Sequence, residues 1–186
     1  MLNQHIVELT EDWIRSFIIP LNICPFAKRE FDKGSIKIDV INASTIQEAL
    51  EEVFMALVFL DKTPEVETSL LVFPSLFNDF LDYLDFVDYA ESLLDEEEYE
   101  GVYQLATFHP NYCFADTDPH DVTNYTNRSP YPMLHLLREK SVEKAIKHYG
   151  DTTKIPEYNM NTMRTLGLEN IKKRLAALKP LEEGDE

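Results

Sequence analysis

The chain has 186 residues, of which 44% are hydrophobic, and its formal net charge at pH 7 is −17. This composition is that of a single globular domain and excludes an intrinsically disordered chain. An acidic surface repels nucleic acid and anionic membranes, so neither is expected as a partner.

The charge is unevenly distributed along the sequence. Residues 1–127 carry 6 Lys and Arg against 25 Asp and Glu, whereas residues 128–179 carry 11 against 5. Two explanations are open: the basic third attracts a small anion, or it covers the acidic part and neutralises it. No secretory signal and no apolar run of membrane-spanning length is visible, and the two Cys are expected to stay reduced. We therefore expect a cytoplasmic protein.

The first helix is predicted from apolar residues at steps of three and four, namely Leu2, Ile6, Leu9, Trp13 and Phe17. It is expected to end before Pro20. Pro25 suits the first position of a second, short helix, which makes Cys24 its predicted N-cap. A thiol at the positive end of a helix dipole can have a lowered pKa. The alternative is that Cys24 is a small buried side chain that fills a gap.

Three strands and two helices are predicted to follow. Residues 35–41 alternate as a half-buried strand, and Thr45–Glu48 forms a capping box that opens a helix through Leu60. Residues 70–73 are continuously apolar, which indicates a strand covered on both faces. Residues 78–94 are predicted to be helical, and residues 102–109 alternate as a third strand that ends at His109.

The last third is predicted to be a long loop followed by helices. Residues 110–129 show no helical or strand period, and their aromatic residues favour an ordered loop. Ser129-Pro130 or Tyr131-Pro132 is predicted to open a helix that ends at Gly150. Further helices are expected near residues 157–166 and 170–178.

These elements predict one α/β domain over residues 1–179 and a disordered acidic tail over residues 180–186. Helical connections favour a small, mainly parallel sheet of about three strands, with packed helices and a helical C-terminal part. A ferredoxin-like α+β arrangement with antiparallel strand pairs is the alternative.

A site is predicted where the third strand ends. Ligands of such sheets bind beyond the carboxyl ends of the strands, so His109 is a candidate general acid or base and Cys24 a candidate nucleophile. Arg128, Ser129 and the N-terminus of the predicted helix would bind an anion, with Arg138 two turns further on. In the alternative interpretation, His109 hydrogen-bonds the backbone and holds the loop in place.

Common metal and cofactor motifs are missing from the sequence. Cys113, His120 and three Asp crowd into residues 113–121, but the spacings CxxC and HxxxH do not occur. The sequence also lacks GxGxxG, Walker and GxSxG patterns. We therefore expect no metal and no cofactor.

Three blocks of the sequence resemble the signature blocks of a bacterial family known as domain of unknown function 1415. They are LNICPFA at 21–27, FHPNYCF at 108–114 and NYTNRSPYPMLHLLRE at 124–139. The family supplies no reaction, but the resemblance directs attention to Cys24, His109 and residues 127–132, which adds Asn127 and Tyr131 to the candidate ligand-binding residues. Cys113 and His120 are not part of the family pattern.

The leading functional hypothesis is a cytoplasmic enzyme, a hydrolase or group transferase that acts on a small anionic molecule. The alternative is a non-catalytic ligand-binding or regulatory protein with an acidic interaction surface. A third possibility is a protein whose function is assembly. The sequence does not specify a protein partner or an oligomeric state.

Overall fold

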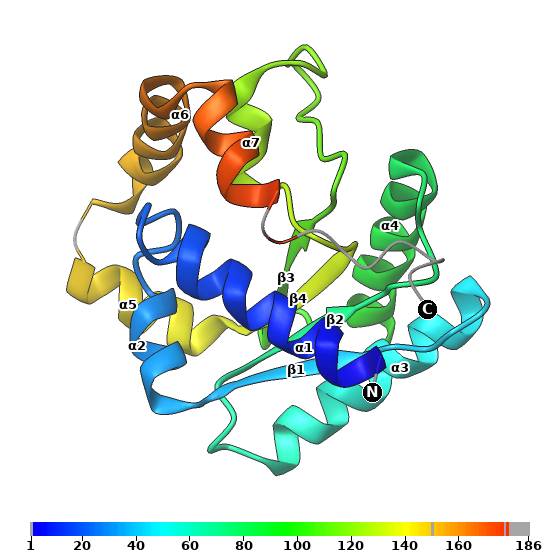
Figure 1. Cartoon of the computed structure of the whole chain (residues 1–186). Coiled ribbons are helices and arrows are strands. Elements are labelled where there is room, and N and C mark those ends of the chain that lie inside the picture. The colour runs from blue at the N-terminus through cyan, green and yellow to red at the C-terminus, as the bar shows by residue number, and fades with distance from the viewer. Residues whose placement is uncertain (1, 150, 177, 179–186) are drawn as a thin grey trace.

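The computed structural model describes residues 2–149, 151–176 and 178, and its centre is a sheet of four strands (Figure 1). The strand order is β1 (Ile36–Val40), β2 (Thr68–Val72), β4 (Met133–Arg138) and β3 (Tyr103–Phe108). β1 and β2 are parallel, whereas β4 is antiparallel to both β2 and β3. The carboxyl ends of β1, β2 and β3 therefore share one edge of the sheet with the start of β4.

Strand β4 stands where the sequence predicted a helix, and that prediction is wrong. Residues 133–138 read MLHLLR, an apolar run that suits a strand covered on both faces. Its backbone pairs with β2 on one side and β3 on the other. The helix begins only at α5 (Glu139–Tyr149). The sheet is therefore mixed and four-stranded, instead of mainly parallel with about three strands.

The ferredoxin-like alternative is not observed either. That fold has the element order βαββαβ. Here the order is β1, α3 (Ile46–Lys62), β2, α4 (Phe80–Glu96), β3 and β4. The antiparallel pairs that the alternative expected do occur, but in a different strand order. The mixed α/β class and the helical C-terminal part are confirmed.

Helices α3 and α4 cover one face of the sheet and begin at side-chain caps. The Thr45 hydroxyl accepts the Glu48 N–H at 3.2 Å, and the Glu48 carboxylate accepts the Ser44 N–H at 2.7 Å. This confirms the predicted capping box. Asp79 caps α4 through the N–H groups of Leu81 and Asp82. The core on this face includes Leu57, Leu71, Phe73, Phe86 and Leu134.

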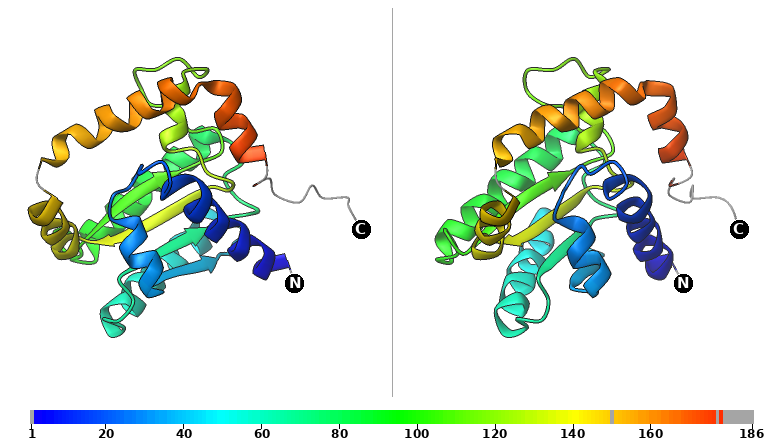
Figure 2. Two further views of the ribbon diagram at one scale, coloured as in Figure 1. Left: turned by 60° about the vertical axis from the view of Figure 1, so that its left-hand side comes forward. Right: turned by 90° about the vertical axis from the view of Figure 1, so that its left-hand side faces the viewer.

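The opposite face is covered by N-terminal and C-terminal helices together (Figure 2). They are α1 (Leu2–Trp13) with a π-helical turn at Ile14–Ile18, α2 (Ala27–Lys33), α6 (Ile155–Leu166) and α7 (Leu168–Ala176). Their core includes Trp13, Phe17, Val72, Met133, Met163 and Ile171. Segments from the two ends of the chain thus share one core, which no local sequence pattern specifies.

Charge is divided between these faces. Helix α4 carries six acidic residues and no Lys or Arg, and Lys62 is the only Lys or Arg between residues 41 and 127. The C-terminal helices, of which α5 and α7 are net basic, lie elsewhere: α6 and α7 share a core with α1 (Figure 2). Tyr149 of α5 contacts Phe26 before α2. The C-terminal third therefore packs away from α3 and α4, the helices that carry much of the acidic charge.

Two further predictions concern the C-terminal tail and membrane-spanning segments. The acidic tail predicted at residues 180–186 lies outside the described residues. No helix within 2–149 or 151–176 has the length and apolar character needed to cross a membrane.

Candidate functional site

His109 follows the last residue of β3 at the carboxyl edge and is fully buried. Its Nε2 lies 2.7 Å from the Phe77 carbonyl, and its Nδ1 lies 2.9 Å from the Asn111 N–H. Because a carbonyl only accepts and an N–H only donates, the ring is neutral with its proton on Nε2. Burial lowers the pKa of His109, and the Phe77 carbonyl opposes this shift. Both ring nitrogens are therefore engaged by the backbone.

Aromatic side chains enclose the His109 ring. The ring centroids of Phe80 and Tyr83 lie 5.1 and 5.2 Å from that of His109. The Tyr83 hydroxyl donates to the Met133 carbonyl at 2.6 Å and accepts the Phe108 N–H at 3.2 Å. Burial raises the pKa of Tyr83, so this hydroxyl stays protonated. Helix α4 thereby joins the end of β3 to the start of β4 around His109.

Arg128 closes the long loop on itself. Its Nε donates to the Tyr112 carbonyl at 3.2 Å, and an Nη donates to the Pro119 carbonyl at 2.8 Å. The guanidinium carbon lies 4.4 Å from the centre of the Tyr125 ring, a cation–π contact. Two N–H groups of the Arg128 guanidinium, which were predicted to bind an anion, are thus bonded to backbone carbonyls.

The neighbours of Arg128 also bond within the loop. The Asn127 side chain donates to the Thr107 carbonyl at 3.1 Å, and its main-chain carbonyl accepts the His109 N–H at 3.2 Å. The buried Ser129 hydroxyl donates to the Tyr131 carbonyl at 2.6 Å. Since no helix begins here, the predicted helix N-terminus of the anion site is absent. Tyr131 is buried, and burial raises its pKa.

Cys24 lies two residues before Phe26, the N-cap of α2, so the prediction that Cys24 caps this helix is wrong. Its thiol is partly exposed and packs against the core beneath α1. Burial raises the pKa of Cys24, and backbone N–H groups of Phe26 and Ala27 oppose the shift. This direction is opposite to the one that a capping position predicted.

Cys24 and His109 pack on different faces of the sheet. Cys24 belongs to the α1 side, whereas the His109 ring lies among Phe77, Phe80 and Tyr83 on the α4 side. Asn159 of α6 fixes the preceding segment by donating to the Ile23 carbonyl at 2.8 Å. The two side chains therefore do not form a nucleophile–base pair.

Arg138 ends β4 at the opposite edge of the sheet from His109, opposite Tyr103 in the strand register. A strand of this length separates the two edges by roughly 17 Å. One nitrogen of its guanidinium donates to the Tyr103 hydroxyl at 3.0 Å, and another donates to the Val66 carbonyl at 3.1 Å and to that of Leu60. One small anion cannot bind Arg128 and Arg138 together.

Sequence reasoning missed two features of the strands. Asp61 accepts the Tyr103 hydroxyl at 2.7 Å, which links it to Arg138. In β4, His135 donates from Nε2 to the Thr68 hydroxyl at 2.6 Å, because the Thr68 proton goes to the Leu136 carbonyl. Burial lowers the pKa of His135 to about 4. The apolar run around His135 was the signal for a buried strand.

The loop at residues 113–121 is also held by its own hydrogen bonds. Asp118 accepts the His120 N–H, Asp121 accepts the Thr123 N–H, and Cys113 lies 3.8 Å from the Asn124 amide nitrogen. Within residues 2–149, 151–176 and 178, no group of three or more His, Cys, Asp or Glu is placed to hold a metal ion.

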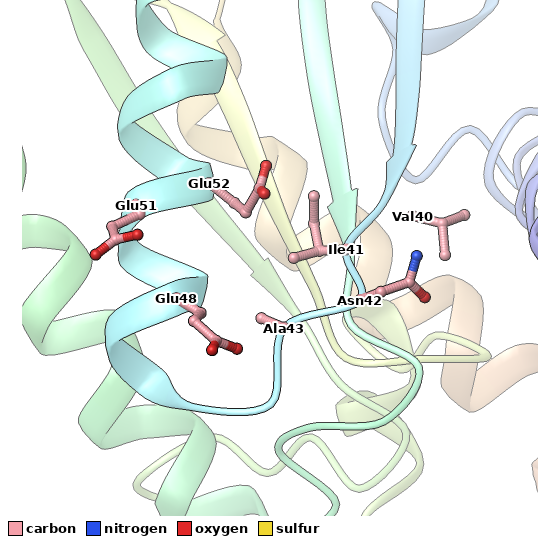
Figure 3. Close-up of a pocket in the computed structure, with 7 residues that line it drawn as sticks. All are labelled: Val40, Ile41, Asn42, Ala43, Glu48, Glu51 and Glu52. Atoms are coloured by element: carbon pink, nitrogen blue, oxygen red, sulfur yellow. The ribbon is translucent and has the colours of Figure 1, made fainter.

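Two surface hollows lie away from all of these residues. One, of about 340 Å³, is lined by residues 40–43 after β1 and by Glu48, Glu51 and Glu52 of α3 (Figure 3). The other, of about 530 Å³, is here called the α3–α4 groove. It is lined by Gln47, Leu50, Glu51, Phe54, Met55, Leu93 and Glu97. Neither hollow includes a residue that the sequence predicted as catalytic or ligand-binding.

Comparison with known proteins places the chain in a family without assigning a reaction. No significant match was found among curated proteins or among solved structures. The model of the family described as "Protein of unknown function (DUF1415)" matches residues 5–173. This match covers most of the chain and confirms the resemblance carried by its three sequence blocks, so the chain belongs to the DUF1415 family.

Proposed function

We propose that this protein is a non-catalytic binding protein whose acidic face meets a basic partner. The acidic face consists of the exposed acids of α3 and α4, namely Glu48, Glu51, Glu52, Asp61, Asp82, Asp85, Asp88, Glu91, Asp95 and Glu96. The observation that carries the proposal is that these charges are not neutralised. Among the ion pairs of the described residues, none uses an acid of α3 or α4.

The physics of such a face favours a cationic partner. Acidic side chains gathered on one surface make the local electrostatic potential more negative, so they attract a cationic partner and repel acidic ones. Exposed apolar side chains lie on the same helices: Met55 is 60% exposed, Leu81 69% and Tyr89 56%. Apolar groups surrounded by polar ones are typical of protein interfaces. Together these features support a protein partner over a small cation.

The surroundings of His109, Arg128 and Ser129 also support a binding role. The side chains of Arg128 and Ser129 hydrogen-bond to backbone groups of their own loop, and that of His109 bonds to the Asn111 N–H and to the Phe77 carbonyl before α4. A catalytic role would require each to break a backbone contact before touching a substrate. These residues are better explained as the framework of the carboxyl edge.

The proposal is tested with a lysine-rich, unstructured peptide as the probe. Its affinity for the protein is measured by fluorescence anisotropy at low and high salt. We expect the variant Asp82→Asn/Asp85→Asn/Asp88→Asn to bind about tenfold more weakly, since each exposed charge contributes a few tenths of a kcal/mol or more. The charge-matched control is Glu8→Gln/Asp116→Asn/Glu157→Gln, exposed acids outside α3 and α4. Equal weakening by both triple variants would refute a localised binding face.

A second candidate is a cytoplasmic hydrolase or group transferase that acts on a small anion. One observation favours it: Cys24 is partly exposed, and the nearby backbone N–H groups of Phe26 and Ala27 act to lower the pKa of its thiol against the effect of burial. Such N–H groups can stabilise a thiolate or an oxyanion beside it. Turnover by this route requires Cys24, so a Cys24→Ser variant that retains any detected hydrolase activity excludes it.

A further inference from the structure

The α3–α4 groove has an apolar floor and an acidic rim. Leu50 and Phe54 from α3 and Leu93 from α4 are partly buried in it, and Met55 is 60% exposed at its side. Glu51 and Glu97, both exposed, contribute carboxylates to the rim. The volume of about 530 Å³ lies within the range of roughly 300–1,000 Å³ that holds small ligands or a few anchoring side chains.

We infer that this groove receives one amphipathic helix of a partner protein, with apolar anchors on one face and Lys or Arg beside them. The inference rests on the proposed function and names its binding mode. A helix in a groove offers apolar side chains at steps of three, four and seven residues, which suits an apolar floor between two helices. Met55 is an adaptable contact because its side chain is flexible and polarisable.

Charge complementarity decides the chemistry of the occupant. Glu51 lines both the groove and the neighbouring hollow, whereas Glu48 and Glu52 lie on the side of α3 that faces Ile41 and Ala43 (Figure 3). At the other end, Glu96, Glu97 and Glu98 are consecutive and exposed. An acidic or neutral helix would leave these carboxylates desolvated without a partner, whereas Lys and Arg flanking the anchors would pair with them.

A second copy of the chain is the competing occupant. Helix α5 carries three Lys and exposes Ile146 and Tyr149, so it resembles the inferred ligand. A contact between α5 and the groove joins two different surfaces, and such head-to-tail contacts form a ring if the rotation closes and an open chain if it does not. A separate basic protein has no such constraint, so it is the occupant that we infer.

The experiment compares two peptides of identical composition, one an amphipathic Lys/Leu/Ala helix and the other its scrambled isomer. The protein is labelled with ¹³C at its Met methyl groups, and binding is followed by NMR. We expect the amphipathic peptide to bind at least about tenfold more tightly. Its binding should shift the Met55 methyl signal, while those of the buried Met133 and Met163 stay in place.

Two variants separate apolar docking from charge. Met55→Glu adds a negative charge, which should strengthen binding that is purely electrostatic. If this variant instead loses the tenfold preference for the amphipathic peptide, the preference depends on the apolar contact of Met55. Leu2→Glu is the matched control, because Leu2 is 63% exposed on α1 and lies outside α3, α4 and the groove. We expect it to keep the preference.

The outcomes distinguish this inference from the function on which it rests. If both peptides bind alike and the α4 triple variant weakens both, the groove inference is overturned and the acidic binding face stands. If neither peptide binds in a salt-sensitive way, the proposed function fails as well. If sedimentation velocity detects self-association that Met55→Glu abolishes, the groove belongs to a second copy and the inference is overturned.

Discussion

Cys24 and His109, the predicted nucleophile and the predicted general acid or base, lie on opposite faces of the central sheet. Cys24 packs beneath α1, and His109 is enclosed by α4 and the turn before it. Both positions are well defined by backbone hydrogen bonds, but neither presents its side chain to the other. Because the sheet separates the two side chains, the presence of Cys24 and His109 in one sequence does not imply a Cys–His catalytic mechanism.

The Cys24 thiol is predicted to react slowly with alkylating reagents at neutral pH. Burial raises its pKa, so the thiolate fraction at pH 7 is below that of a free cysteine. Iodoacetamide labelling followed by mass spectrometry gives the rate as a function of pH. We expect the rate to rise at a higher pH than for glutathione.

The partly exposed Cys113 serves as an internal comparison in the same digest. Faster labelling of Cys24 than of glutathione at pH 7 would contradict the raised pKa. It would also restore the enzyme candidate, which depends on an ionised thiol.

Most elements of the fold could be predicted because local signals agreed. The capping box at Thr45–Glu48, the apolar run before Pro74 and the alternation before His109 each specify one structure. Strand β4 was not predicted, because apolar residues at positions 133, 134, 136 and 137 fit a helical spacing as well as a strand that is covered on both faces. Its two neighbours in the sheet decide between them, and they lie far away in sequence.

The sequence predicted at which edge of the sheet the candidate site residues lie, but not their hydrogen-bond partners. His109, Asn127 and Arg128 do gather at one edge, as the strand-end argument expected. Their partners are carbonyls of Phe77, Thr107 and Pro119, which no residue spacing reveals. The acidic face was visible as charge in the sequence, but the location of the basic helices depends on how the ends of the chain pack.

Replacing His109 by Ala is predicted to destabilise the protein by roughly 3 kcal/mol. The substitution leaves the Phe77 carbonyl and the Asn111 N–H without their partner and opens a cavity beside Phe80 and Tyr83. Urea unfolding measures the loss. The surface control His148→Ala, on exposed helix α5, should change stability by less than about 0.5 kcal/mol. A mild effect of His109→Ala would mean that its buried contacts are not structural.

Arg128→Ala is predicted to loosen the loop at residues 110–121. The guanidinium joins the Tyr112 and Pro119 carbonyls, so its removal frees both ends of this segment. Limited proteolysis with thermolysin, which unlike trypsin does not require the Arg that is removed, should cut this segment faster in the variant than in the wild type. Arg128→Lys should not restore protection, because an ammonium group cannot span two carbonyls in the planar geometry of a guanidinium.

The same variant tests anion binding. A thermal-shift titration with phosphate compares wild type and Arg128→Ala. Since the guanidinium is already bonded within the loop, we expect the shift to be the same in both chains. Phosphate stabilisation that disappears only in Arg128→Ala would support the enzyme candidate instead.

Arg138→Gln is predicted to cost about 2–4 kcal/mol, because Arg138 connects three parts of the fold. It binds carbonyls at the end of α3 and the Tyr103 hydroxyl, which in turn donates to Asp61. Tyr99→Phe is the control: Tyr99 also donates to Asp61, but without contacting Arg138, and its loss should cost about 1 kcal/mol or less. Chemical unfolding that ranks the two variants in the reverse order would contradict this role.

His135 is predicted to make stability depend on pH in mildly acidic solution. Its pKa is about 4 in the folded protein and about 6.5 when unfolded. Between these values the unfolded chain binds a proton that the folded chain does not, so stability falls as the pH drops from 6.5 towards 4 and is unaffected by His135 above 7. From pH 7 to pH 5 the loss is about 2 kcal/mol.

His135→Gln keeps a donor for the Thr68 hydroxyl but does not titrate, so its urea-unfolding free energy should lack this loss. His109 contributes equally to both chains. Parallel pH profiles for wild type and His135→Gln would mean that His135 is not held neutral between β2 and β3.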